Sequence, residues 1–284
     1  NLPLKHPVNL AYEAATADLD DVNMIDPFHL EAYGETTVNY NRDVEIFPVL
    51  NAMFEQIYGE SPYKSPTDMG VNMAGFCIVD DAACRRASEQ EIIRRYYQSL
   101  CSLRQGLSEQ EEVFKLELLM NQIGLKPESR AVVPAALARA EETGAPAVAM
   151  ELPNGKLVTG KTSPLLGASS ACLLNALKCL GGIPEDVLLI SPNIIEPIQH
   201  LKVEHMGNHN PRLHTDEVLI ALSICAVTDP NAERAMEQLA ALAGGEVHST
   251  VILSRVDENV FQHLRMNLTC EPKYQTKKLY HGKK

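Results

Sequence analysis

The sequence predicts a helical N-terminal domain followed by a layered α/β domain, so the expected fold class is α/β plus all-α. Two observations lead to this prediction. Residues 1–143 contain mainly long helical runs, whereas residues 144–284 alternate short apolar strands with helices. The chain of 284 residues is also long enough for two compact domains, because single hydrophobic cores stop growing near this size. We therefore expect the domain boundary between residues 143 and 144.

Helices are expected along most of the first domain. The run at 41–59 places apolar residues three and four apart and ends at a glycine. The next two runs begin at Ser88 and Ser108, and in each a glutamate follows the serine by three residues, which is the pattern of a capping box. A further helix is expected after Pro127. It should end at Thr143.

The second domain is expected to begin with a β-hairpin. Strands at 146–152 and 156–161 flank Asn154-Gly155, whose two residues tolerate the positive φ of a tight hairpin turn. Two more apolar runs, at 187–191 and 246–253, predict further strands. Helices are predicted at 164–180, 194–204, 216–228, 231–243 and 257–265.

Composition narrows the possible partners. The formal charge is −12 and the isoelectric point is near 5.2, which argues against nucleic acid or an anionic membrane as a partner. The seven cysteines include no C-x-x-C pair, no apolar run reaches the length of a spanning helix, and the start lacks the features of a secretion signal. These observations predict a cytoplasmic protein. The acidic segment at 18–35 is interpreted as a solvated linker.

One segment matches a nucleotide-binding motif by its letters. Gly155 to Thr162 fits G-x-x-x-x-G-K-S/T, the pattern of loops that hold phosphates with consecutive backbone amides. The four variable residues, 156–159, prefer extended structure, and Gly155 completes the Asn-Gly turn. A hairpin therefore explains the first half of the match better than a phosphate loop does.

The second half of the match predicts an anion site. Ser163 before Pro164 has the pattern of a helix N-cap followed by proline at the first helical position. The preceding residues would then face the positive end of the helix dipole, an arrangement that suits phosphate or carboxylate. The predicted anion-binding residues of this segment are Gly160, Lys161, Thr162 and Ser163. The alternative is that Ser163 only caps the helix while Lys161 is solvated.

Four of the nine histidines lie within fifteen residues, at positions 200, 205, 209 and 214. Histidines and nearby carboxylates are the usual ligands of zinc. However, Gly207 and Pro211 interrupt any helix there, and no H-E-x-x-H pattern is present. We therefore assign no metal ligands from the sequence, although a metal-dependent hydrolase built on this segment remains an alternative.

The end of the histidine segment forms a compact polar cluster before a helix. Arg212, His214 and Asp216 lie on a loop that enters the apolar helix expected from residue 216, and binding residues often occupy such loops. If this loop meets the segment at 160–163 at one edge of the sheet, Arg212 and Lys161 would bind an anion. His214 or Asp216 would then transfer a proton, and these two are the predicted catalytic residues.

Several long strings of the chain carry a resemblance to a known family. They include YGESPYKSPTDMGVNM, LVTGKTSPLLGASSACLLNALK, NPRLHTDEVLIALS and EVHSTVILSRVD. With these strings, the chain resembles bacterial proteins of the family called domain of unknown function 1846. The resemblance implies that the chain is the C-terminal portion of a longer protein whose upstream α/β region carries a glycine-rich phosphate loop. It supplies no catalytic residue.

These observations favour part of a cytosolic enzyme that binds a nucleotide or another phosphorylated small molecule. The missing N-terminal region of the same protein would share the ligand, and no cofactor can be named. One alternative is a non-catalytic scaffold in which the helical domain forms a homo-oligomer. The sequence alone leaves open whether the protein is an enzyme.

Overall fold

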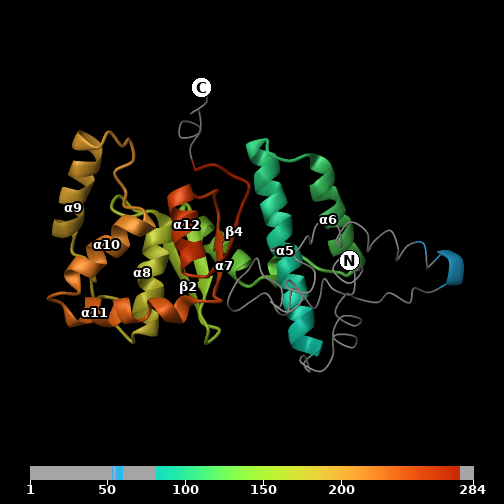
Figure 1. The fold of residues 1–284 in the computed structure, drawn as a ribbon, viewed down its shortest axis with the longest axis horizontal. Helices are drawn as coiled ribbons and strands as arrows, with labels where there is room; N and C mark the ends of the chain where they lie inside the picture. The colour runs from blue at the N-terminus through green and yellow to red at the C-terminus, as the bar shows by residue number, and fades with distance from the viewer. Residues whose placement is uncertain (1–52, 54–55, 60–80, 276–284) are drawn as a thin grey trace, which may run out of the picture. The chain divides into compact units, whose positions relative to one another are not determined.

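The computed structural model describes residues 53, 56–59 and 81–275, and it divides the chain into two compact units (Figure 1). The units are residues 1–130 and 131–284. The expected boundary at 143/144 falls after this division, because helix α7 (Val132–Thr143) packs against the sheet of the second unit. The fold class is as predicted, with helices preceding an α/β domain.

Two packed helices dominate the described part of the first unit. Helix α5 (Asp81–Gln105) packs against α6 (Gln110–Gln122), and the short helix η2 (Pro127–Ser129) follows. The buried apolar residues of these two helices are Ile92, Ile93, Tyr97, Val113, Leu116, Leu119 and Met120. Helix α5 extends through Ser88 and Glu109 is the N-cap of α6, so the two predicted serine caps are wrong. Most of the predicted helix at 41–59, and the acidic segment at 18–35, lie outside the described residues.

The second unit is built on a four-stranded sheet in the order β2-β1-β3-β4. The strands are β1 (Ala147–Glu151), β2 (Leu157–Lys161), β3 (Glu246–Ser249) and β4 (Asn267–Cys270). Strand β1 is antiparallel to both β2 and β3, whereas β3 and β4 are parallel. The predicted hairpin is confirmed, with Gly155 at φ 75° in the turn between β1 and β2.

One predicted strand is absent, and one strand of the sheet was not predicted. The run at 187–191 forms no strand, because Nζ of Lys178 donates to the backbone carbonyls of Glu185 and Val187 and holds the segment as a loop. Leu189 and Ile190 are nevertheless buried, so the apolar run fills the core without pairing. Strand β4 was not predicted. Its four residues pair with β3 and complete the sheet.

Helices cover both faces of the sheet. In β1, Ala149 clusters with Val132 and Ala136 of α7. Its neighbour Val148 is directly opposite Gly160 in β2, and successive strand residues face opposite sides. A Cβ at Gly160 would meet the backbone of α8 (Ala168–Leu180), so α8 lies on the face opposite α7. The unit is therefore layered as helix, sheet and helix.

Of the remaining helices, α9, α10 and α11 lie together on the side of α8 (Figure 1). Helix α9 continues into a π-helix, η3, and α11 is followed by the short η4, while α12 connects β3 to β4. None of the helices in the described ranges is long and apolar enough to cross a membrane. Their bounds are α9 Pro192–His200, η3 Leu201–His205, α10 Thr215–Cys225, α11 Pro230–Glu237, η4 Leu239–Leu242 and α12 Arg255–His263.

The contact between β2 and α8 gives a stability prediction. A Cβ built on Gly160 would clash with the backbone nitrogen of Cys172, so Gly160→Ala must push α8 away from the sheet. We expect a loss of about 1–3 kcal/mol or more in the free energy of unfolding, measured by chemical denaturation. The adjacent, exposed Lys161 is the control, and Lys161→Ala should change it by less than about 0.5 kcal/mol. Equal stability of the two variants would contradict this packing.

Candidate active site

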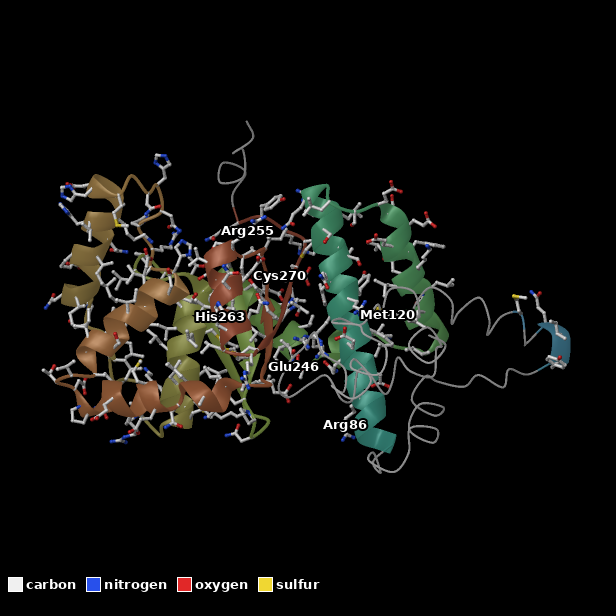
Figure 2. The ribbon with its side chains drawn as sticks, viewed as in Figure 1. Arg86, Met120, Glu246, Arg255, His263 and Cys270 are labelled. Carbon is white, nitrogen blue, oxygen red and sulfur yellow. The ribbon has the colours of Figure 1, made fainter. Side chains whose placement is uncertain are left out.

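The candidate site lies where β3 leads into α12. Strand β3 ends at Ser249, and after a short loop Ser254 caps α12, whose two ends Arg255 and His263 are labelled in Figure 2. Because β3 and β4 are parallel and α12 joins them, the beginning of α12 lies toward the carboxyl ends of both strands. Ligands of α/β proteins commonly bind at that edge.

A buried carboxylate, Asp257, joins the beginnings of two helices. Its Oδ1 accepts hydrogen bonds from the backbone N–H and the hydroxyl of Thr215, both at 3.0 Å. Its Oδ2 accepts from the hydroxyl of Ser254 at 2.8 Å and lies 3.0 Å from Nδ1 of His214. We call His214, Thr215, Ser254 and Asp257 the Asp257 cluster. Through it, the first turn of α12 is tied to the first turn of α10.

His214 is the partly exposed member of this cluster whose ring can both accept and release a proton near neutral pH. Its side chain is 29% exposed, whereas that of Asp257 is 9% exposed. The bond between Asp257 and Nδ1 leaves Nε2 without a hydrogen-bond partner among the residues that the structure describes. In the neutral imidazole, a proton on Nδ1 that is donated to Asp257 makes Nε2 a proton acceptor.

Ser254 does not complete a nucleophilic triad. Its hydroxyl donates to Asp257 and lies 3.4 Å from Nδ1 of His214, on the side of the ring that faces the carboxylate. A serine nucleophile would have to reach Nε2. Ser254 therefore orients Asp257, and the cluster has the geometry of a carboxylate–histidine pair.

The two charged groups shift each other's pKa. The hydrogen bond to Asp257 raises the pKa of His214, and the charge of that carboxylate adds to the effect against the opposing influence of partial burial. Burial alone would raise the pKa of Asp257, but the hydrogen bond from His214, its charge, and the bonds from Thr215 and Ser254 together lower it. Both shifts favour the charged pair, an imidazolium beside a carboxylate, and the raised pKa makes the neutral imidazole of His214 a stronger base.

A buried lysine fixes the loop that carries His214. Nζ of Lys202, in η3, donates to the backbone carbonyl of Arg212 at 2.7 Å and to Oε2 of Glu217 at 2.6 Å. The same oxygen of Glu217 accepts the backbone N–H of His214 at 2.8 Å. Because the side chain of Lys202 is only 3% exposed, its charge depends on these partners. The loop is consequently held at both Arg212 and His214.

The two segments that sequence analysis singled out lie against each other. Nε of Arg212 donates to the backbone carbonyl of Ser163 at 2.7 Å, and Leu213 forms a parallel bridge with Leu166. Leu213 is fully buried, and residues on either side of an extended residue lie on the opposite side of the chain. The side chain of Arg212 thus contacts the 163–166 loop, whereas that of His214, two residues later, contacts Asp257 and Ser254.

The predicted helix start behind the anion site is wrong. Helix α8 ends at Leu180 as predicted but begins at Ala168, with Gly167 rather than Ser163 as its N-cap. The hydroxyl of Ser163 instead accepts the backbone N–H groups of Leu165 and Leu166 in a local turn. The free amides of the first helical turn therefore follow Gly167 and not Ser163.

The other residues of the predicted anion site, Gly160, Lys161 and Thr162, lie in or just after strand β2. Gly160 is buried in β2, where its lack of a side chain admits α8, and Lys161 ends the strand with an exposed side chain. The backbone N–H of Thr162 donates to the carbonyl of Pro146 at 2.9 Å. Gly155 to Thr162 thus runs through a hairpin turn and strand β2.

His214 was predicted from the sequence, but its partner Asp257 was not. Asp216, the other predicted catalytic residue, accepts the backbone N–H of Glu217 at 2.8 Å, which stabilises the first turn of α10. Asp257 and Ser254 were missed. They stand three residues apart as Ser-x-x-Asp before a helix, a pattern that marks a helix start and could have directed attention to them.

The fold and this site define an α/β protein with a carboxylate–histidine pair at the carboxyl edge of its parallel strands. Comparison with protein families gives the narrower assignment. The chain belongs to the DUF1846 family, because "Domain of unknown function DUF1846, N-terminal" matches residues 1–124 and "Domain of unknown function DUF1846, C-terminal" matches residues 128–280. Both regions of the family are thus represented in the chain, and the predicted resemblance is confirmed.

Close relatives occur in streptococci. A UPF0371 protein of Streptococcus thermophilus (strain CNRZ 1066) is 61% identical over 280 residues, which are 99% of this chain and 57% of the relative. A UPF0371 protein of Streptococcus pneumoniae (strain JJA) is 59% identical over the same shares. The chain therefore spans a little over half the length of these relatives. Membership of the family assigns no reaction, so function has to be argued from the site.

The His214–Asp257 pair predicts a defined pH dependence of stability. The raised pKa of His214 stabilises the folded state fully below its unfolded value near 6.5, and this contribution is lost as pH rises through the folded pKa. The lowered pKa of Asp257 contributes above its unfolded value near 3.9 and is lost as pH falls through the folded pKa. We expect His214→Gln to destabilise more at about pH 5.5 than at about pH 8.5.

Denaturant unfolding at the two pH values measures this difference, and NMR titration gives a direct control. The pKa of the His214 ring should fall in Asp257→Asn, because its largest raising influence is removed. A loss of stability that is equal at both pH values would contradict the ion pair.

Proposed function

We propose that the α/β unit provides general acid–base catalysis on a phosphorylated small molecule, with His214 as the group that exchanges the proton. The observation that carries the proposal is the contact of Nδ1 of His214 with the buried Asp257, which leaves Nε2 available on a partly exposed ring. This is how enzymes orient a histidine base and stabilise its protonated form. The activity of the longer relatives would include this step.

The Asp257 cluster contains a histidine base but no serine nucleophile, and this combination limits the reaction it can catalyse. Nε2 of His214 accepts a proton from a water or from a substrate hydroxyl, and Asp257 stabilises the imidazolium that forms. Ser254 faces the carboxylate, so the nucleophile comes from the substrate or from solvent rather than from this serine. The reaction class is therefore a proton transfer or a hydrolysis without a serine-bound intermediate.

Arg212 supports an anionic substrate. Its Nε is held by the carbonyl of Ser163, so the guanidinium is oriented while its two terminal nitrogens make no hydrogen bond to residues in the described ranges. An oriented guanidinium binds phosphate through paired donors. Lys161 precedes Ser163 by two residues, so their Cα atoms lie within roughly 7 Å of each other. The ammonium of Lys161 therefore adds a second positive charge near Arg212.

Ligand binding tests the proposal on the full chain. We would screen inorganic phosphate, pyrophosphate, nucleotides and sugar phosphates by thermal shift, because a ligand specific to the folded state raises the midpoint. A ligand at about 100 times its Kd adds about 2.7 kcal/mol of stability. Arg212→Gln should abolish the shift. Arg255→Gln, at an exposed arginine of α12, is the matched control and should retain it.

Turnover of a ligand found in that screen tests the catalytic role. His214→Gln should retain the thermal shift while the rate of product formation, followed by phosphorus NMR, falls by about 100-fold to 10,000-fold. Equal rates in His214→Gln and the wild type would overturn the assignment of His214. Loss of the thermal shift in Arg255→Gln but not in Arg212→Gln would move the anion site elsewhere.

A second candidate function, self-association without catalysis, rests on one observation. Helix α10 and the residue beyond its C-cap expose Ile220, Ile224 and Val227, which are 61%, 64% and 81% exposed and lie at helical spacing. A row of exposed apolar side chains is typical of an interaction surface. A symmetric dimer would bury this row against the same row of a second copy.

Sedimentation analysis separates this candidate from a monomeric enzyme. The wild type should sediment as a dimer, and Ile224→Glu should sediment as a monomer because it places a charge within the apolar row. Ser223→Glu adds the same charge at the neighbouring exposed position and should leave the dimer intact. A monomeric wild type would exclude self-association through α10.

A further inference from the structure

The π-helix η3 adds a third side chain to a pair that ordinary helical spacing already brings together. In an α-helix, with 3.6 residues per turn, a residue lies over the residue four positions later and away from the fifth. In η3 the backbone N–H of Met206 donates to the carbonyl of Leu201 at 3.1 Å, five residues back. This wider turn places both Glu204 and His205 beneath His200. Single π-turns in helices occur frequently at functional sites.

The three side chains have the atoms and the spacing of a metal-binding set. One ligand atom each from His200, Glu204 and His205 lies within 4.8 Å of the other two. Nε2 of His200 is 3.1 Å from Oε2 of Glu204, and the centroids of the two imidazole rings are 5.9 Å apart. Ligand atoms at about 2.0–2.2 Å from one zinc ion lie roughly 3–4 Å from each other. Small rotations of these exposed side chains would close the set.

The backbone under the three ligands is held in place. Lys202 lies inside the same π-helix, points into the protein and is fixed by Glu217 and the carbonyl of Arg212. Lys202 is buried and faces the protein interior. The three candidate ligands, His200, Glu204 and His205, are exposed on the outer side of the helix. A fixed backbone reduces the conformational entropy lost when the side chains bind an ion.

We infer that His200, Glu204 and His205 form a binding site for a divalent transition metal, with zinc as the best-suited ion. Two imidazoles and one carboxylate are the donor set that zinc shares with cobalt and nickel, whereas magnesium and calcium prefer sites made of oxygen atoms alone. Three protein ligands leave coordination positions for water or for an atom of a bound ligand. The site is separate from the Asp257 cluster, and it does not depend on the function proposed for His214.

Calorimetric titration of zinc into the full chain, prepared without a histidine tag, tests the site. The wild type should bind one equivalent through these ligands, and His200→Ala or His205→Ala should weaken that binding at least about 10-fold. Glu204→Gln should weaken it less, because the amide keeps an oxygen but loses the charge. His209→Ala and His263→Ala remove exposed histidines outside the set and should bind zinc as the wild type does.

A spectroscopic readout and one further variant make the test decisive. Cobalt(II) should give visible absorption bands with the wild type that His205→Ala loses. Circular dichroism should be unchanged in all variants, because the three side chains are exposed. His214→Gln should bind zinc normally, so failure of the proposed catalytic role would leave this result intact. Absence of zinc binding by the wild type, or undiminished binding by His200→Ala, would overturn the inference.

Discussion

The second unit depends on the need to satisfy a buried carboxylate. Removing Asp257 from water would cost several kcal/mol if its oxygens lacked donors. Its donors come from Thr215 and His214 at the start of α10 and from Ser254 at the start of α12. The beginnings of two helices must therefore lie together, where both helix dipoles also favour the negative charge. This packing also fixes the orientation of the His214 ring, because its Nδ1 contacts Asp257 before any ligand binds.

A second buried charge, the ammonium of Lys202, connects η3 to the same region of the fold. Its bonds to Glu217 and to the carbonyl of Arg212 connect η3 with the loop that carries His214. Glu217 belongs to both networks, because the oxygen that accepts from Lys202 also accepts the backbone N–H of His214. A change in the backbone of η3, for example when an ion binds its exposed side chains, would therefore act on the loop that carries His214.

Local features of the fold could be predicted from the sequence, and features set by distant residues could not. The Asn-Gly hairpin formed as predicted because its turn and both strands are contiguous. The start of α8 was misplaced because Leu166, just after the apparent cap, is held extended by its bridge to Leu213. For the same reason His214 could be found from its polar neighbours, whereas its pairing with Asp257, 43 residues away, could not. The metal-ligand set was missed because helical spacing does not anticipate a π-turn.

The central position of β1 has a consequence for the order of folding. Strand β1 pairs with β2 across a short turn, but it pairs with β3 across about a hundred intervening residues, as the contact of Ala147 with Thr250 illustrates. Contacts of such separation form slowly because the chain must first pay the entropy of closing a long loop. During synthesis, the hairpin emerges from the ribosome before β3 and α12. His214 therefore cannot pair with Asp257 until that residue, 43 positions further along the chain, has also emerged.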